Sequence, residues 1–468
     1  MRKNPILAAV LFVTGALFLS CSKYDKNVGQ PAEAQEIRFS ATLAPKHGDV
    51  AQTRAIIDNN GTMAWTFGEQ IAIYYETSDG HATAIATVSD PPYENGSANI
   101  TATFDADKAP VDGGEAKFVY PASLHNGAGD IDESKLLTGQ RGVLTPSGSG
   151  TDYSISTCFD AATATGKIVL TGSTTSYDVP TTATVTSASG SGNVTLTNRV
   201  CICKFTFSVS LSGSSSMISA LQAVDIHIDG RTYSISPSRY NSDHCLYVAM
   251  LPCTGADALF GAYNYGQASG DVTLYGENYV KLAKNVTLEA GKFYTNIPIV
   301  CVSATEYSGN KTTPLYPGKE IGAIILNNVD FAVHEDSAIN IVYDPEQVTP
   351  DFIILLKGNN TVSSIRSGSC AIEGPKSALS LTIGGNGSLT ASAVYHENKW
   401  GAAIGGANQG YVGNINIHGT IQSLTANGGI GAGYGGSVNS VTIDGVLNPT
   451  SDSTYPHLTR SGDTWTHK

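Results

Sequence analysis

Residues 379–391 read LSLTIGGNGSLTA, and altered copies of this segment recur through the last third of the chain. The copies lie at 354–362, 415–426 and 441–446. Equivalent aliphatic positions are 27, 34 and 26 residues apart, counted from Leu356 through Ile383 and Ile417 to Ile443. Repeats of this size, built from short apolar strands punctuated by Gly and Asn, are typical of parallel β-helices.

Glycine and asparagine would form the corners of such coils, because both residues tolerate positive φ. We therefore predict a short right-handed parallel β-helix over residues 319–468, with about four or five coils and ends that need covering. Residues 431–436 also fit the G-x-G-x-x-G pattern of dinucleotide sites. No βαβ unit surrounds them, so we interpret this motif as a corner that repeats the one at 404–406.

Upstream of the repeats, apolar and polar residues alternate in short runs separated by turn clusters, which predicts antiparallel sheets. Residues 37–43 and 100–104 are examples. We predict an all-β protein with β-sandwich domains at 36–175 and 176–304, followed by a linker at 305–318.

The chain begins with a basic segment and an apolar run from Ile6 to Leu19. This is the pattern of a secretory signal, and the run is too short to span a bilayer. Cys21 follows a small residue, and the site resembles the lipobox of bacterial lipoproteins, whose cysteine is acylated and becomes the new N-terminus. We predict a signal peptide at 1–20, lipidation of Cys21, a polar tether at 21–35 and an outer-membrane, cell-surface location.

Composition excludes several functions. The net charge is −13, which argues against nucleic-acid partners because phosphates require a basic surface. We expect no cofactor and no metal, since the ten histidines are scattered and Cys201-x-Cys203 lacks zinc-ligand spacing. Seven cysteines follow Cys21, an odd number whose pairing the sequence leaves open. We interpret Cys201 and Cys203 as buried thiols, on one strand face with Phe205.

Several segments of the first 304 residues carry a family resemblance. They are IRFSA at 37–41, TRA at 53–55, WTFGEQIAIY at 65–74, FVYPA at 118–122, LTNRVCICKFTF at 196–207, YVAMLP at 247–252 and AGKFYT at 290–295. In this order, behind a lipobox, they resemble the fimbrillin-like surface proteins of Bacteroidetes, which build or accompany donor-strand pili and have transthyretin-like sandwiches. Glu69 departs from the Asp usual in that family.

This resemblance implies partners and a processing site. Other fimbrillin-like subunits would bind by donor-strand exchange, after a trypsin-like cut at Arg54 removes the first strand. An exposed loop arginine without a role is the alternative reading of Arg54. Residues 450–468 lack sustained apolar alternation and would make a poor donor strand, so we expect the chain at the tip of any pilus it enters.

The repeats resemble the β-helical carbohydrate-binding domains of secreted bacterial proteins, through Leu-x-Gly-x-Asn and Ala-x-Ile-Gly-Gly patterns. Their aromatic residues are therefore candidates for glycan binding, because exposed rings stack on sugars. These residues are Tyr395, Trp400, Tyr411 and Tyr434. Each could instead pack against the coils or their cap.

We predict a non-catalytic surface adhesin or pilus subunit with a glycan or host-surface ligand. A polysaccharide lyase or glycosidase with a catalytic β-helix is one alternative, and a solitary glycan-binding lipoprotein is another. The nine carboxylates between Asp330 and Asp444 do not recur at one phase of the repeat. This favours solvated carboxylates over a catalytic pair.

Overall fold

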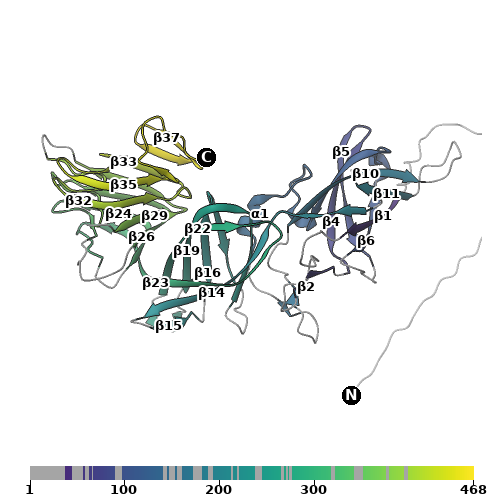
Figure 1. Cartoon of the computed structure of the whole chain (residues 1–468), viewed down its shortest axis with the longest axis horizontal. Coiled ribbons are helices and arrows are strands. Elements are labelled where there is room, and N and C mark those ends of the chain that lie inside the picture. Colours follow the sequence, from purple (N-terminus) through teal and green to yellow (C-terminus); the bar gives the residue numbers. More distant parts are fainter. Residues whose placement is uncertain are drawn as a thin grey trace, which may run out of the picture.

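The computed structural model describes most of the chain from Ile37 onward. The described residues are 37–44, 56–57, 63–65, 67–89, 97–140, 145–146, 153–154, 161–171, 182–187, 193–211, 214–218, 221–237, 245–264, 268–269, 272–273, 277–317, 322–341, 351–375, 379–394 and 399–468. They form three β-rich domains that follow one another along the long axis (Figure 1). Helical elements within these ranges are η1 (Ala106–Lys108), η2 (Ala122–Leu124) and α1 (Glu133–Thr138). The predicted all-β class is confirmed.

The first domain contains a nine-stranded sheet in the order β11-β1-β6-β5-β4-β7-β10-β13, with β12 also beside β1. Its strands are β1 (Ile37–Ala44), β4 (Gln70–Thr77), β5 (Gly80–Val88), β6 (Ala98–Phe104), β7 (Gly114–Tyr120), β10 (Ala162–Thr171), β11 (Thr182–Ser187), β12 (Asn193–Thr195) and β13 (Thr197–Asn198). A smaller sheet contains β2 (Ile56–Ile57), β3 (Met63–Ala64), β8 (Thr145–Pro146) and β9 (Tyr153–Ser154). In β6 every second residue from Ala98 to Phe104 is buried, as alternation requires. Trp65 lies in this core.

The first domain extends past the predicted boundary at residue 175. Strand β11 pairs antiparallel with β10 and parallel with β1, and β12 and β13 join the same sheet. Strands β11, β12 and β13 therefore belong to the first domain, and β14 begins the second. An alternating run can complete either neighbouring sheet, so alternation alone could not assign this segment.

The second domain is a curled, mostly antiparallel structure in which β14 and β23 pair in parallel. Its strands are β14 (Cys201–Leu211), β15 (Ser214–Met217), β16 (Ala223–Ile228), β17 (Arg231–Ile235), β18 (Cys245–Met250), β19 (Cys253–Asn264), β20 (Ala268–Ser269), β21 (Val272–Thr273), β22 (Glu277–Leu288) and β23 (Phe293–Lys311). Cys201, Cys203 and Phe205 lie together in its core. The predicted burial of this strand face is therefore confirmed.

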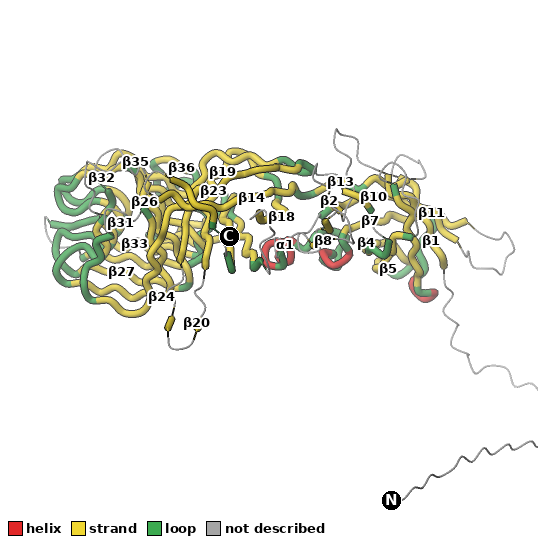
Figure 2. The backbone as a smooth tube through the Cα atoms, turned by 90° about the horizontal axis from the view of Figure 1, so that it is seen from below, coloured by secondary structure: helices red, strands yellow, loops and turns green. Residues whose placement is uncertain are grey.

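The third domain is a stack of parallel coils (Figure 2). Its strands are β24 (Ala323–Val333), β25 (Ile339–Asn340), β26 (Asp351–Lys357), β27 (Asn359–Ser364), β28 (Ile372–Glu373), β29 (Ser380–Gly385), β30 (Ser388–Ala393), β31 (Ile404–Gly405), β32 (Tyr411–Ile417), β33 (Ser423–Asn427), β34 (Ile430–Gly431) and β35 (Ser437–Ile443). Parallel pairing joins β24-β26-β29-β32-β35, β24-β27-β30-β33 and β25-β28-β31-β34. Each coil thus contributes to the same ladders as the coil before it.

Buried aliphatic side chains form a column through the stack. Its members are Ile324, Ile354, Ile383, Ile417 and Ile443. The predicted equivalence of the last three is confirmed. The equivalence of Leu356 is wrong by two residues, because Leu356 pairs with Gly385 and Ile354 pairs with Ile383. Both Ile354 and Leu356 face inward, so spacing alone could not choose between them.

Glycines at the coil corners permit close contact between successive turns of the backbone. Gly405 has φ of 140°, and a Cβ there would lie 1.9 Å from the carbonyl oxygen of Gly431. A Cβ on Gly433 would lie 2.5 Å from the carbonyl oxygen of Gly406. The G-x-G-x-x-G segment is therefore a corner that packs on the corner of the previous coil.

Both ends of the stack are covered. At the C-terminal end lie β36 (Val446–Leu447), β37 (Leu458–Ser461) and β38 (Thr464–His467). Strands β37 and β38 form a hairpin, and β38 pairs antiparallel with β33. Trp465, Leu458 and Tyr455 are buried in the coil core. These C-terminal residues thus cover the last coil of the stack.

At the other end, β23 continues the second domain into the coils. It pairs in parallel first with β14 and then with β24. The predicted linker at 305–318 therefore begins inside a strand. Gly309 has φ of 70° beside a register shift in the β23–β24 pairing. Apolar residues of both domains share a core at this joint: Leu259, Tyr263, Val280, Ala323, Ile325, Ile353 and Leu355.

Candidate functional site

Trp400 and Tyr434 lie together on loops between the coils, and we call this pair the aromatic corner. Their ring centroids are 6.3 Å apart and the rings meet at 61°. The Tyr434 N–H donates to the carbonyl of Trp400 at 2.9 Å, and the Tyr434 carbonyl accepts from the Gln409 N–H at 2.8 Å. These backbone contacts hold the loops of successive coils together. The structure thus brings together two of the four predicted ligand-binding aromatics.

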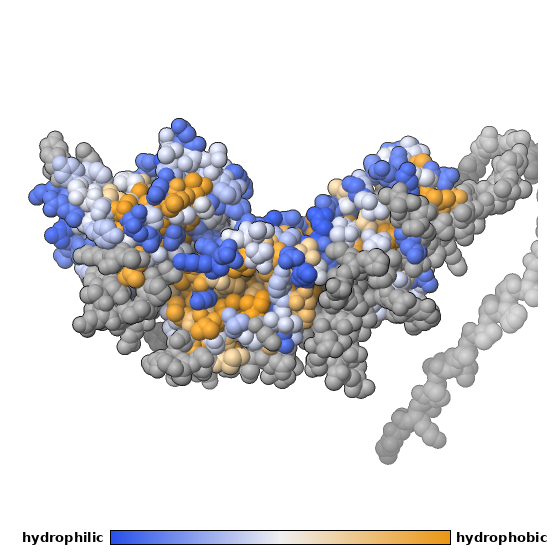
Figure 3. Space-filling view, viewed as in Figure 1, coloured by the Kyte–Doolittle hydropathy of each residue, from blue (hydrophilic) through white to orange (hydrophobic). Residues whose placement is uncertain are grey.

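The other two predicted aromatics are placed differently. Tyr411 is the first residue of β32 and is 46% exposed, while Tyr395 lies outside the described residues. Tyr434 is 42% exposed, so part of its ring is available to a ligand. Figure 3 shows hydrophobic residues over the middle domain and over part of the C-terminal domain, with hydrophilic residues around them. A partly exposed ring such as that of Tyr434 suits a polar ligand with an apolar face.

Strand β1 is the segment that the predicted cleavage at Arg54 would separate from the first domain. It pairs antiparallel with β6 from Ile37 to Leu43, and its other edge pairs in parallel with β11 and β12. A strand with partners on both edges is inside the sheet, and its departure would uncover the edge of β6. Cys21 and Arg54 themselves lie outside the described residues.

A polar cleft lies at the joint between the second and third domains. Its volume is about 300 Å³. One wall comes from Asp229 and Gly230 at the β16–β17 turn and from residues 254–257 of β19. The other wall comes from β29, β32 and β35 and from the turn and cap residues that follow β35. Sequence patterns gave no sign of this cleft, because its two walls come from separate parts of the chain, residues 229–257 and residues 382–457.

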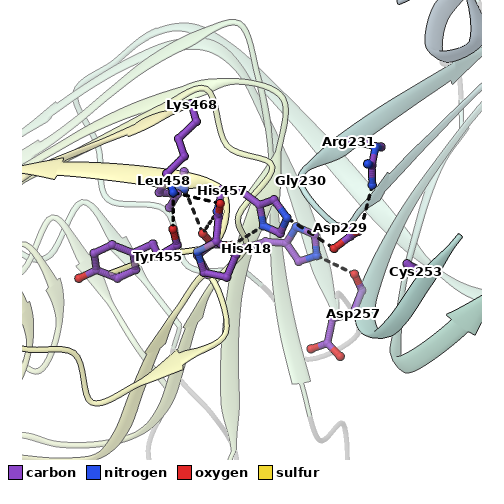
Figure 4. A network of polar contacts seen from close by, with 12 residues as sticks. Asp229, Gly230, Arg231, Cys253, Asp257, His418, Tyr455, His457, Leu458 and Lys468 are labelled. Atoms are coloured by element: carbon purple, nitrogen blue, oxygen red, sulfur yellow. Dashed lines mark hydrogen bonds and ion pairs between the residues drawn. The ribbon is translucent and has the colours of Figure 1, made fainter. Parts of the chain in front are cut away.

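A histidine and two carboxylates connect the walls of the cleft (Figure 4). Nδ1 of His457 lies 2.8 Å from Oδ1 of Asp444, and its Nε2 lies 3.5 Å from Oδ1 of Asp229. The N–H of Leu458 also donates to Asp444, at 3.0 Å. Arg231 in turn donates to Asp229 at 2.8 Å. These contacts hold the C-terminal cap against the β16–β17 turn.

A second histidine joins the same walls. Nε2 of His418 lies 2.9 Å from the carbonyl oxygen of Asp257, so this nitrogen donates. Nδ1 of His418 lies 2.9 Å from the hydroxyl oxygen of Thr420. Burial lowers the pKa of His418 below its usual value, and the ring is therefore neutral at pH 7. Beneath the cleft, burial lowers the pKa of His227 to about 3.

Three carboxylates of the coils have structural partners. Asp336 accepts from the hydroxyl of Tyr316 at 2.6 Å, and Glu373 accepts from Ser337 at 2.8 Å. Asp444 is held by the cap, as described above. No group of three or more potential metal ligands occurs among the described residues.

All six cysteines in the described ranges are free and buried. The Sγ atoms of Cys201 and Cys203 are 3.9 Å apart, in contact without a covalent bond. Burial raises the pKa of Cys301 to about 12, so this thiol stays protonated at neutral pH. These residues act as small apolar core groups.

The chain was compared with known proteins. No family model matches it, and no curated protein matches it. It is similar to the structure of a fimbrial protein from Bacteroides ovatus, with 12% identity, a TM-score of 0.26, and coverage of 57% of this chain and 49% of that one. The chain thus spans about half of that protein.

Two further structures are similar at the same level. The tip fimbrial protein Mfa3 from Porphyromonas gingivalis shares 12% identity over 60% of this chain and 84% of its own, with a TM-score of 0.21. The minor pilin GBS52 from Streptococcus agalactiae shares 10% identity over 60% of this chain and 99% of its own, with a TM-score of 0.20. At these TM-scores the matches do not establish a shared fold.

Within the described ranges, no helix is both long and apolar enough to cross a membrane.

Proposed function

We propose that this chain is a non-catalytic, lipid-anchored adhesion protein of the cell surface that can serve as the tip or accessory subunit of a pilus. The observation that carries this proposal is the different pairing of β1 and β38. Near the N-terminus, β1 lies inside a sheet, where another strand could replace it. At the C-terminus, β38 is committed to the chain's own cap.

The acceptor role depends on β1. Cleavage at Arg54 would separate β1 from the rest of the domain and open a groove between β6 and β11. The floor of that groove would be apolar, because Ile100, Ala102 and Phe104 of β6 belong to the core. A donor strand from another fimbrillin-like subunit would restore the backbone hydrogen bonds and refill the pockets.

Strand β38 is unsuited to act as a donor strand for another subunit. Trp465 is buried in the coil core, and the N–H of His467 donates to the carbonyl of Gln422 at 3.0 Å. Release of this hairpin would expose the end of the coil stack to water. A subunit that accepts a strand and gives none would sit once per polymer, at its tip.

The third domain would carry the adhesive function. We interpret its coil stack as a short right-handed parallel β-helix, with the aromatic corner as the contact for a glycan or host-surface ligand. Trp400→Ala and Tyr434→Ala should each weaken adhesion of cells to an immobilised glycan. Tyr316→Ala, which removes an exposed aromatic elsewhere in the domain, is the matched control.

Three measurements test processing, anchoring and assembly. N-terminal sequencing of the surface form should find Ala55 first if Arg54 is processed, and this cut would remove the lipid on Cys21 together with β1. Cys21→Ala should prevent lipid attachment to the unprocessed chain. Immunogold labelling of the third domain should mark pilus ends only. Periodic label along the shaft would contradict the tip assignment, and free protein without pili would support a solitary glycan-binding lipoprotein.

A further inference from the structure

The floor of the joint cleft is a polar ladder on the outer face of the coils. Thr382, Asn416 and Thr442 pair in register on the neighbouring strands β29, β32 and β35. Their sequence neighbours Ile383, Ile417 and Ile443 face the core, so these three side chains face outward. All three line the cleft.

The outward column of the coils changes from apolar to polar residues at the point where the apolar joint with the second domain ends. In the two earlier coils, the same outward column contains Ala323 and Ile353, which are buried in the apolar joint. The column then changes to Thr382, and an open cleft replaces the packed interface. If this outward column served only to pack against β19, we would expect apolar residues at positions 382, 416 and 442 as well.

Thr382 supplies the second observation. Its side chain is 2% exposed, and its hydroxyl oxygen has no hydrogen-bond partner. A buried hydroxyl without a partner is unfavourable, so such a group at the bottom of a cleft points to a ligand that completes it. Among the described residues, the side chains of Asn416 and Thr442 likewise make no hydrogen bond with one another or with their neighbours.

Charge restricts the ligand. The cleft is lined by Asp229, Asp257 and Asp444 and by no Lys or Arg among the described residues, which disfavours anions. These carboxylates are already engaged: Asp444 by His457, Asp229 by Arg231, and Asp257 by the N–H of Asn285 at 3.1 Å. They are therefore not open as a cation site. The uncommitted groups are hydroxyls and an amide, which suit a neutral ligand rich in hydroxyl groups.

We propose that this cleft binds one unit of a neutral saccharide, with Thr382, Asn416 and Thr442 as its hydrogen-bonding floor. Neighbouring strands are ~4.8 Å apart, comparable with the separation of hydroxyls across a pyranose ring. A volume of about 300 Å³ is at the small end of ligand sites and fits a single sugar unit. The cleft shares no residue with the aromatic corner, and the proposal stands apart from pilus assembly.

Calorimetric titration of the full chain in detergent tests this site, with galactose, mannose, fucose and N-acetylglucosamine as probes and glucuronate as the anionic comparison. At least one neutral sugar should give a saturating binding curve. Glucuronate should bind at least about tenfold more weakly than that sugar. Thr382→Val should weaken binding by about three- to tenfold, the effect of one hydrogen bond. Thr382→Ser, which keeps the hydroxyl, should bind as the wild type does.

A control variant separates this site from the rest of the coil surface. Thr390→Val removes an exposed threonine hydroxyl on β30 and should leave binding unchanged. Failure of all four sugars to saturate, equal binding by Thr382→Val, or equal affinity for glucuronate would each overturn the proposal. Calcium that displaced the sugar would also overturn it, since the cleft would then be a cation site.

Discussion

Nδ1 of His457 lies 2.8 Å from a carboxylate oxygen of Asp444, and the backbone N–H of His457 donates to the other oxygen of the same carboxylate. Asp444 follows the last coil strand, and His457 precedes the capping hairpin. This pair therefore attaches the C-terminal cap to the coil stack. It also brings the imidazole to Asp229, so one side chain links the cap to the second domain.

Asp444→Asn should destabilise the cap by about 1–3 kcal/mol. The amide has one oxygen in place of two, so at least one of the donors that now bind Asp444 loses its acceptor. Asparagine tolerates the φ of 48° at this position, so backbone strain does not enter. Chemical denaturation measures the change. Asp463→Asn, at an exposed position of the same hairpin, should change stability by less than about 0.5 kcal/mol.

Gly405→Ala should destabilise the coil stack by about 3 kcal/mol or more, because it combines an unfavourable φ with a clash against the backbone of Gly431. Gly429→Ala separates the two causes. Gly429 has φ of 79°, but a Cβ at this position would meet no atom within 4 Å, so its cost should be only about 1 kcal/mol. Equal effects of the two substitutions would show that close approach of the corners is unimportant.

Stability should fall as the pH drops from about 6.5 toward 3. The unfolded chain binds a proton at histidine near pH 6.5, whereas burial lowers the pKa of His227 to about 3 in the folded chain. The unfolded state therefore binds more protons in this window, and the slope for this group is at most about 1.4 kcal/mol per pH unit. His227→Asn should reduce the slope. His334→Asn, at an exposed site, should leave it unchanged.

The core thiols should not react in the folded protein. Cys201, Cys203 and Cys301 are buried, and a pKa of about 12 for Cys301 leaves almost no thiolate at pH 8. Iodoacetamide at pH 8, followed by site-resolved mass spectrometry, should modify these three cysteines only after denaturation. Recovery of a disulfide-linked peptide from native, oxidised protein would contradict the free-thiol assignment.

The repeat was readable from sequence because its physical cause is local. Inward aliphatics and corner glycines recur in every coil, and the pairing of Leu389 with Leu424 and of Ile404 with Ile430 follows that recurrence. The pairing register between coils could not be predicted where two inward-facing residues lie two positions apart on one strand, as Ile354 and Leu356 do. Alternation also predicted one strand through Cys201, Cys203 and Phe205, which lie on β14, and the burial of Cys201.

The sequence by itself determined an all-β chain, the identity of its core-facing positions and the glycine corners of its coils, since each depends on a short-range period or on the conformational freedom of one residue. Tertiary structure decided which sheet β11, β12 and β13 complete, how β23 passes from one domain to the next, and which of the aromatic residues meet. It alone created the joint cleft, because Asp229, Thr382 and His457 become neighbours only when two domains pack. Contacts between residues so far apart depend on the whole fold, which no local pattern encodes.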